Sequence, residues 1–236
     1  MNDHHVETRE SFSRVAELYN EVFFRADEEA VTRMFFPNDG SVLIVGCGAG
    51  RTVIPMIQKG FKVSAFDISS QMVELAKKQL VEHGLSADIR CLDALFLKQE
   101  YEGQKFDVIF FPFHALDYIF PLENRISVLL QAKALLNEGG KIIFSTHNRF
   151  FPRSLKQFIH FHENEYTYLR SKEGDLFTFT SDPWRDARQL RNHFARVQFF
   201  HRYSFIPMGK EAALKERLAR LTAPLLDKSF YFVLSS

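Results

Sequence analysis

Three glycines at alternate positions are the first residues of this sequence whose type and spacing suit chemistry. Gly46, Gly48 and Gly50 directly follow the apolar run at 42–45. Glycine accepts positive φ angles and lets a ligand come close to the main chain. From about Arg51 the sequence predicts a helix, whose N-terminus would point into the same turn and favour an anion or carboxylate. The pattern therefore predicts a strand, a glycine turn and a helix, the nucleotide-binding corner of a doubly wound α/β sheet.

Two aspartates stand at the ends of the next two predicted strands. Asp67 follows the strand predicted at 61–66, where a carboxylate can accept both hydroxyl hydrogens of a ribose. The alternative is a helix N-cap, because Ser69 and a predicted helix follow. We prefer the ribose role, because strand, acid and glycine turn come in the required order. Asp93 follows the strand predicted at 87–92 and by itself would be a common turn residue. The evidence for a ligand site is therefore the series Gly46, Asp67 and Asp93 at three successive strand ends.

Two histidines follow the fourth and fifth predicted strands. His114 comes soon after the fourth, and His147 follows the strand predicted at 141–146. Histidine titrates near neutral pH and is the usual general base. Either histidine could remove a proton from an oxygen or nitrogen atom, with Asp117 or Tyr118 as the orienting partner. The alternative is a loop histidine satisfied by backbone hydrogen bonds, which has equal weight for His114 and is preferred for His147.

Alternating strands and helices are predicted to position these residues. Short turns join the elements, which favours a parallel sheet with helices on both faces. The helix before the fifth strand is predicted to stop at Gly139-Gly140. The fold class is therefore α/β with a doubly wound sheet. The strands are predicted at 42–45, 61–66, 87–92, 106–113 including the exit from the strand, and 141–146.

The segments outside this alternating core are predicted to cover it within one domain that spans residues 1–236. Residues 9–38 should form two helices, and Tyr19 could contact a substrate, although a core position is the preferred alternative. Residues 149–183 should form a short helix and an aromatic hairpin, which we interpret as a cap over the substrate. The remaining elements are a helix near 185–194, a strand at 196–203, a helix near 210–222 and a strand at 230–234.

Composition excludes several classes of protein. The chain has 236 residues, 46% of them hydrophobic, which suffices for a sizeable core. Its net charge of +1 gives no general attraction to nucleic acid or to an anionic membrane. Two cysteines make no disulfide framework, the opening residues 1–5 lack the apolar core of a signal peptide, and no apolar run is long enough to span a bilayer. These features predict a soluble, cytoplasmic protein without a membrane partner.

The glycine turn resembles the first motif of class I S-adenosylmethionine (SAM) methyltransferases. Their turn has the pattern G-C-G-x-G, and residues 46–50 are Gly-Cys-Gly-Ala-Gly. Dinucleotide enzymes instead use G-x-G-x-x-G, and Arg51 stands where their third glycine belongs. The segment 113–119 is similar to the family's F-N-S-L-G-Y-L exit, in which His114 takes the asparagine position. One departure is Ile44, where the family often carries an acid, so contacts to the methionine end of SAM are expected from elsewhere.

The resemblance implies a seven-stranded sheet with an antiparallel C-terminal strand, SAM as the cofactor, and N-terminal helices over the SAM pocket. It implies that Asp67 binds the ribose and that Asp93 meets the adenine amino group. The cofactor-binding residues implied are Gly46, Cys47, Gly48, Gly50, Asp67, Ile68, Met72, Asp93, Ala94 and Phe111. Tyr19 and Tyr118 are the substrate candidates, and His114 and His147 are the catalytic candidates.

The leading hypothesis is a SAM-dependent methyltransferase that acts on an oxygen or nitrogen atom of a small molecule. No Cys/His cluster has metal-ligand spacing, so no metal is expected. An RNA or protein methyltransferase is an alternative, but the neutral charge balance argues against nucleic acid. A non-catalytic SAM-binding scaffold is a second alternative, and a dinucleotide oxidoreductase is a third. The sequence predicts neither the acceptor nor an oligomeric state.

Overall fold

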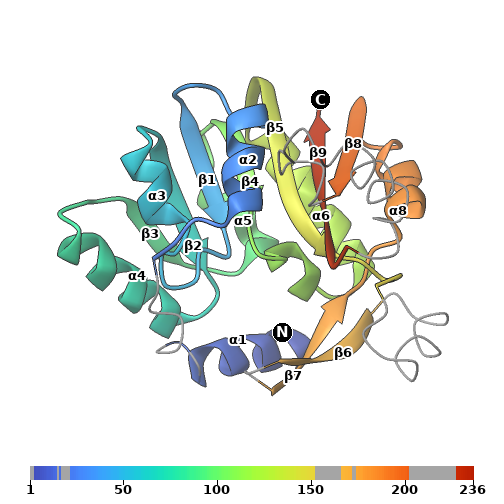
Figure 1. Cartoon of the computed structure of the whole chain (residues 1–236), viewed down its shortest axis with the longest axis horizontal. Helices are drawn as coiled ribbons and strands as arrows, with labels where there is room; N and C mark the ends of the chain where they lie inside the picture. The colour runs from blue at the N-terminus through green and yellow to red at the C-terminus, as the bar shows by residue number, and fades with distance from the viewer. Residues whose placement is uncertain (1–2, 15, 17–21, 152–165, 172–173, 202–226) are drawn as a thin grey trace, which may run out of the picture.

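The computed structural model describes residues 3–14, 16, 22–151, 166–171, 174–201 and 227–236. Within them a seven-stranded sheet has the strand order β3-β2-β1-β4-β5-β9-β8 (Figure 1). All pairings are parallel except that β9 is antiparallel to both of its neighbours, which confirms the predicted fold. The strands are β1 (Ser41–Val45), β2 (Lys62–Asp67), β3 (Asp88–Cys91), β4 (Phe106–Phe111), β5 (Leu136–His147), β8 (Arg196–His201) and β9 (Ser229–Ser235).

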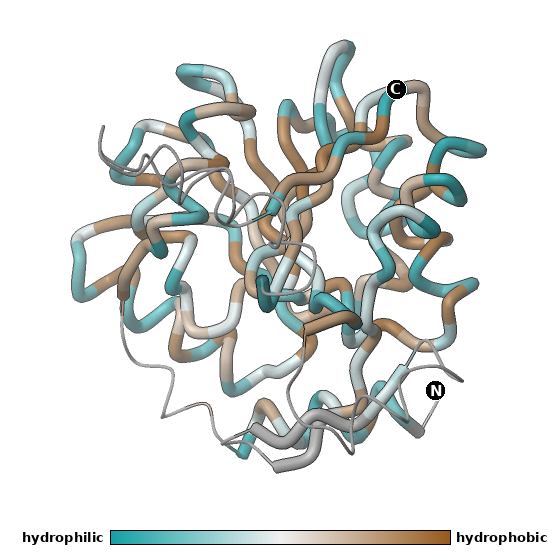
Figure 2. Tube along the Cα trace, turned by 45° about the vertical axis from the view of Figure 1, so that its right-hand side comes forward, coloured by the Kyte–Doolittle hydropathy of each residue, from teal (hydrophilic) through white to brown (hydrophobic). Residues whose placement is uncertain are grey.

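Strand β1 lies inside the sheet, between β2 and β4, and is buried on both faces. Leu43 and Val45 belong to the hydrophobic cluster on one face, and Val42 and Ile44 belong to the cluster on the other. Successive side chains of a strand point to opposite faces, so an unbroken apolar run buries both. Figure 2 shows the apolar strands inside and polar segments outside. This double burial is what fixes the glycine turn at the carboxyl edge of the sheet.

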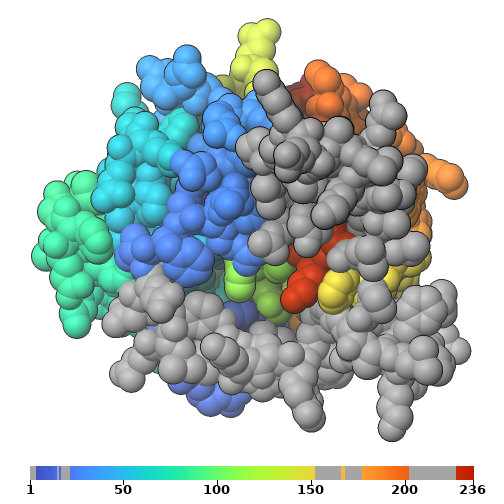
Figure 3. All heavy atoms as spheres, in the orientation of Figure 1, coloured from blue at the N-terminus to red at the C-terminus, as the bar shows by residue number. Residues whose placement is uncertain are grey.

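Helices cover both faces of the sheet. Figure 3 shows α2 (blue) and α3 (cyan) side by side on the face turned to the viewer. The hydrophobic cluster to which each helix contributes buried side chains shows which face of the sheet that helix covers. Among the helices of the described ranges, none combines the length and the apolar character that a bilayer-spanning segment needs. One face carries α2 (Ala26–Phe35), α3 (Val53–Gln58) and α4 (Ser70–Glu82), and the other carries α5 (Leu97–Glu100), α6 (Leu122–Ala134) and α8 (Pro183–Leu190).

A helix and a separate hairpin meet at the edge of the sheet where the glycine turn lies. Helix α1 (Asp3–Arg14) lies beside the antiparallel pair β6 (Tyr166–Ser171) and β7 (Gly174–Phe179) in Figure 1. The ring of His4 stacks on Phe177 with centroids 4.2 Å apart, which joins the two elements. The predicted hairpin is present, whereas Tyr19 and the helices predicted near 155 and 210–222 lie outside the described residues.

Two local predictions were wrong. Gly139-Gly140 does not end the preceding helix, because α6 stops at Ala134 and both glycines lie inside β5. A Cβ atom on Gly140 would lie 2.9 Å from the carbonyl oxygen of Asn137, so glycine is required where the strand register shifts. Helix α3 begins at Val53 and not at Arg51, because the turn with its left-handed glycines extends further.

Candidate active site

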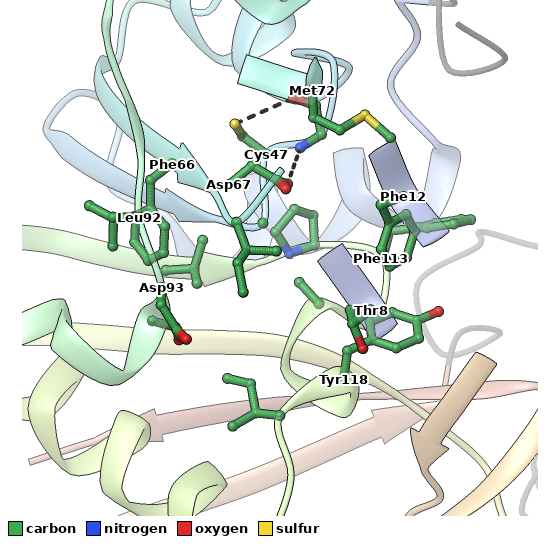
Figure 4. A pocket seen from close by; sticks show the side chains of 18 of the residues that line it. Thr8, Phe12, Cys47, Phe66, Asp67, Met72, Leu92, Asp93, Phe113 and Tyr118 are labelled. Carbon is green, nitrogen blue, oxygen red and sulfur yellow. Dashed lines mark hydrogen bonds between the residues drawn. The ribbon is translucent and has the colours of Figure 1, made fainter. Parts of the chain in front are cut away.

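A pocket of about 1020 Å³, counting the part open to solvent, lies at the carboxyl edge of the sheet (Figure 4). Its wall comes from α1, the glycine turn, the ends of β2, β3 and β4, and the 3₁₀ turn η3 (Ala115–Tyr118). The lining residues are His5, Thr8, Phe12, Val45, Gly46, Cys47, Gly48, Ala49, Arg51, Thr52, Phe66, Asp67, Ile68, Met72, Leu92, Asp93, Ala94, Pro112, Phe113, Ala115, Tyr118 and Ile119.

The three glycines of the turn have different tasks. Gly46 has φ of 74°, and a Cβ atom there would lie 2.6 Å from the Cβ of Ala115. Gly48 has φ of 53° and open space beside it, and its N–H donates to Asp67. A Cβ atom on Gly50 would lie 3.4 Å from Ala76 of α4, and Gly50 does not line the pocket. Glycine is therefore needed for close packing at the first position and for left-handed backbone at all three.

Asp67 at the end of β2 is held by the main chain. Its Oδ2 accepts a 2.8 Å hydrogen bond from the N–H of Gly48, and its Oδ1 accepts one of 3.0 Å from Ser69 (Figure 4 draws the first). Burial raises the pKa of Asp67 above the usual range, and the hydrogen bonds from Ser69 and Gly48 offset part of this. Ser69 caps α4 by accepting from the N–H of Met72, so Asp67 is not the cap.

Asp93 lies after β3, on the side of the pocket that Figure 4 shows opposite Phe12 and Tyr118. Its Oδ1 accepts from the N–H of Leu95, and its Oδ2 lies 3.3 Å from Nδ1 of His5. Burial opposes ionisation of Asp93. The hydrogen bonds from His5 and Leu95 and the nearby positive charge nevertheless lower its pKa below the usual value.

The remaining cofactor candidates divide into pocket and core. Ile68, Met72 and Ala94 line the pocket together with Cys47. The Cys47 thiol is buried, which raises its pKa well above the usual value, so it remains protonated and acts as a small turn residue. Phe111 lies fully buried in the core and outside the pocket, because its position on β4 points its side chain into the sheet packing.

An ion pair holds Arg51, which lines the pocket. Nη1 and Nη2 of Arg51 each lie 2.6 Å from a carboxylate oxygen of Glu28, which is buried at the start of α2. The guanidinium groups of Arg25 and Arg51 each lie 5.3 Å from the ring of Phe113. Phe113 is 43% exposed and has φ of 48°. The pocket residues Arg51 and Phe113 are therefore held by an ion pair and by cation–π contacts.

The two candidate catalytic histidines lie together but do not line the pocket. Their rings stack with centroids 3.9 Å apart. Nε2 of His114 lies 2.8 Å from the Ser229 hydroxyl, and the backbone of His114 has φ of 64°. Nδ1 of His147 lies 2.9 Å from Oδ2 of Asp117. The ring of His147 thus contacts the carboxylate of Asp117, the predicted orienting residue, and the main-chain carbonyl of His114 accepts a 2.8 Å hydrogen bond from the N–H of Asp117.

Asp117 is fully buried and gathers four donors. Arg125 and Thr146 each donate to its Oδ1 over 2.8 Å. The backbone N–H of His147 donates to Oδ2 over 2.8 Å, next to the ring nitrogen. A neutral His147 that donates from Nδ1 to this carboxylate carries its lone pair on Nε2. The arrangement can therefore hold a histidine in the tautomer that accepts a proton.

Sequence reasoning missed two of the residues that α1 brings to the pocket. His5 and Thr8 line it, although the cover was predicted within 9–38 and with Tyr19 as its contact, whereas Phe12, which also lines it, lies within the predicted range. No local pattern marks His5, because its partner Asp93 is 88 residues away. Tyr118 does line the pocket, with its ring against that of Phe12. In the described ranges, no three His, Cys, Asp or Glu side chains are grouped to hold a metal ion.

Comparisons with known proteins agree with this geometry. Residues 42–140 match the family model described as a methyltransferase domain. The chain is 33% identical over 111 residues to a ubiquinone biosynthesis O-methyltransferase of Actinobacillus pleuropneumoniae serotype 5b, and the match covers 46% of each protein. The chain thus spans about half the length of the curated relatives it matches.

Solved structures share the fold over nearly the whole chain. The CcbJ methyltransferase of Streptomyces caelestis superimposes with a TM-score of 0.69 at 15% identity, over 96% of this chain and 97% of that one. A SAM-dependent methyltransferase of Clostridium acetobutylicum gives 0.64 at 15% identity, over 94% and 95%. Residues 42–140 thus match a methyltransferase domain, and the strand order and the pocket at the glycine turn are consistent with the class I, Rossmann-like fold of SAM-dependent methyltransferases.

Proposed function

We propose that this protein transfers a methyl group from SAM to an oxygen or nitrogen atom of a small molecule. The observation that carries the proposal is a single pocket in which a left-handed glycine turn and two strand-end carboxylates, Asp67 and Asp93, face the same space. A nucleoside with a charged amino acid end matches these groups. The curated relatives are named as ubiquinone biosynthesis O-methyltransferases, which supports an oxygen acceptor.

The cofactor is proposed to lie along the pocket wall. Asp67 would accept the ribose hydroxyls, and Asp93 would accept from the adenine amino group. The main chain at Gly46 and Gly48 would face the methionine end. Ile44 is fully buried in β1 and supplies no acid there. SAM supplies an electrophilic methyl group when bound, so the protein needs mainly to orient the acceptor and exclude water.

The acceptor is proposed to enter beside Tyr118 and Phe113, with the β6–β7 hairpin as part of the cap. Tyr166 of the hairpin donates a 2.7 Å hydrogen bond to the carbonyl oxygen of Ile119, a pocket residue, which ties the cap to the wall. Tyr19 stays a second candidate contact. Within this proposal one domain spans the chain, with the N-terminal helices and the hairpin segment as its covers.

A general base would accept the acceptor's proton as the new bond to the methyl carbon forms. His147, oriented by Asp117, is our first candidate, and His114 is the second. Neither ring lines the pocket, so an acceptor would have to reach past η3, or proximity alone would suffice for an acceptor that is already deprotonated. The same observation favours a second candidate function, a SAM-binding protein without turnover.

Calorimetry and a turnover panel test the proposal together. We expect binding of SAM and S-adenosylhomocysteine, no binding of NAD, and methylation of at least one phenol or amine in the panel. The Gly48→Val variant should lose SAM binding but stay folded, because its side chain would fill the open space beside a left-handed backbone. Binding without turnover would favour the scaffold, and NAD binding would contradict the cofactor assignment.

A further inference from the structure

His5 connects the covering helix α1 to the wall of the pocket. Its side chain is 4% exposed, although it lies near the start of the chain. Nδ1 lies 3.3 Å from Oδ2 of Asp93, and Nε2 lies 3.1 Å from the carbonyl oxygen of Phe120. Both His5 and Asp93 line the pocket. A residue from the cover therefore contacts the carboxylate that faces the proposed adenine end.

The partners of the imidazole are mainly acceptors. A carboxylate oxygen and a carbonyl oxygen can both be satisfied only if both ring nitrogens donate. The N–H of Phe120 also lies 3.4 Å from Nε2, but this is the longer contact. Whether Nε2 donates to the carbonyl oxygen or accepts from this N–H, Nδ1 donates to Asp93. The lowered pKa of Asp93 agrees with a donor and positive charge at this position, to which Arg9 of the same helix adds.

Other contacts fasten α1 without an ionised partner. The Ser13 hydroxyl lies 2.9 Å from that of Ser69, and Phe12 packs edge-on against Tyr118. His4 stacks on Phe177 of the hairpin. These contacts hold the helix by packing and by neutral hydrogen bonds. The contact with Asp93 differs, since it depends on a group that the cofactor would also use.

We propose that His5 is a positioning residue for the adenosyl end of the cofactor: it holds the Asp93 carboxylate in place and couples closure of α1 to adenine recognition. A carboxylate oxygen has two lone-pair directions, so Asp93 can accept from His5 and from an amino group together. The carboxylate is oriented before the ligand arrives, which saves ordering entropy on binding. This inference rests on the proposed function, because it concerns the pocket assigned there to SAM.

Three substitutions of His5 separate its two hydrogen bonds. His5→Asn keeps a donor near the position of Nδ1, His5→Gln keeps one near Nε2, and His5→Leu keeps neither. S-adenosylhomocysteine affinity, measured by calorimetry on the full chain, should fall roughly tenfold for Leu and Gln and stay within about threefold of the wild type for Asn. Rescue by Gln but not by Asn would overturn the inference, since it would assign the role to Phe120.

A double-mutant cycle with Asp93→Ala measures the coupling directly, because alanine leaves no acceptor for His5. In that background His5→Leu should cause no further loss of affinity, whereas His4→Leu, the matched control on the same helix, should have the same effect as in the wild type. Equal effects of His5→Leu in both backgrounds would show that the imidazole only fills space, and would overturn the inference. Circular dichroism and the Tm without ligand check that each variant is folded.

S-inosylhomocysteine provides a specificity readout, because a carbonyl replaces the amino group of its base. The wild type should bind S-adenosylhomocysteine more tightly than S-inosylhomocysteine, and His5→Leu should reduce this difference in affinity. If the wild type binds S-adenosylhomocysteine and only the His5 effects are absent, this inference fails and the proposed function stands. If the wild type binds neither nucleoside, the proposed function fails, and this inference fails with it.

Discussion

The two halves of the sheet edge use carboxylates in different ways. In the β1–β3 half, Asp67 and Asp93 border the pocket, and each accepts at least one backbone N–H. In the β4–β5 half, Asp117 is fully buried outside the pocket and holds Arg125 and His147. The first half can therefore touch a ligand directly, whereas the second acts on a ligand only through the histidine that it orients.

Removal of the Asp117 carboxylate should have the largest effect. Asp117→Ala leaves Arg125, Thr146 and two donors of His147 without their acceptor, and breaking a buried charge pair costs about 3–5 kcal/mol. Urea denaturation should show this loss of unfolding free energy. Asp88→Ala is the control, because its pair with Arg90 is largely exposed and should contribute about 0–1 kcal/mol. Equal losses for both variants would remove the distinction between the halves.

The histidines should affect rate and not cofactor binding. If His147 is the base, His147→Ala should lower kcat by roughly 10²–10⁴-fold and leave SAM affinity nearly unchanged. The wild-type rate should rise with pH in the range where histidines titrate, about pH 5 to 8, and that limb should vanish in the variant. The same measurements on His114→Ala form the matched comparison. A loss of the limb in that variant alone would transfer the role to His114.

Asp67 should affect binding and not folding. Asp67→Ala should weaken SAM binding by about 1–3 kcal/mol, the value of charge-assisted hydrogen bonds to buried hydroxyls. The Tm without ligand should not fall through loss of charge, because burial already disfavours the ionised form of this carboxyl. Calorimetry and a thermal melt measure both quantities. Unchanged affinity would contradict the ribose assignment. It would also contradict the statement that Asp67 in the β1–β3 half of the sheet edge touches the ligand directly.

The smallest expected effect is a difference between the pH ranges in which the two pocket acids, Asp67 and Asp93, take up their protons. The pKa of Asp67 is raised and that of Asp93 is lowered, so Asp67 should take up its proton first as the pH falls. A lowered native pKa means that Asp93 contributes stability above its unfolded value of about 3.9, which is lost as the pH falls through the native pKa. Asp67 has the opposite sign, because its ionisation costs stability as the pH rises. Carboxyl ¹³C titration by NMR would show the order, and simultaneous protonation would contradict it.

Much of the pocket wall could be predicted because its parts are local. An apolar run, a glycine turn and an acid after the next strand follow one another in the sequence, and parallel strands bring their carboxyl ends to one edge. This logic placed Gly46, Gly48, Asp67 and Asp93 at one pocket. It could not separate Gly48 from Gly50, since which glycine meets α4 depends on how that helix packs.

What the sequence by itself determined is the order of strands, turns and strand-end acids, because these depend on residues close together in the chain. Tertiary structure alone decided which distant groups meet. His5 reaches Asp93 across 88 residues, and Asp117 pairs with His147 across 30. Such contacts depend on how whole helices and strands pack, and packing is set by the summed burial of many side chains rather than by any local pattern.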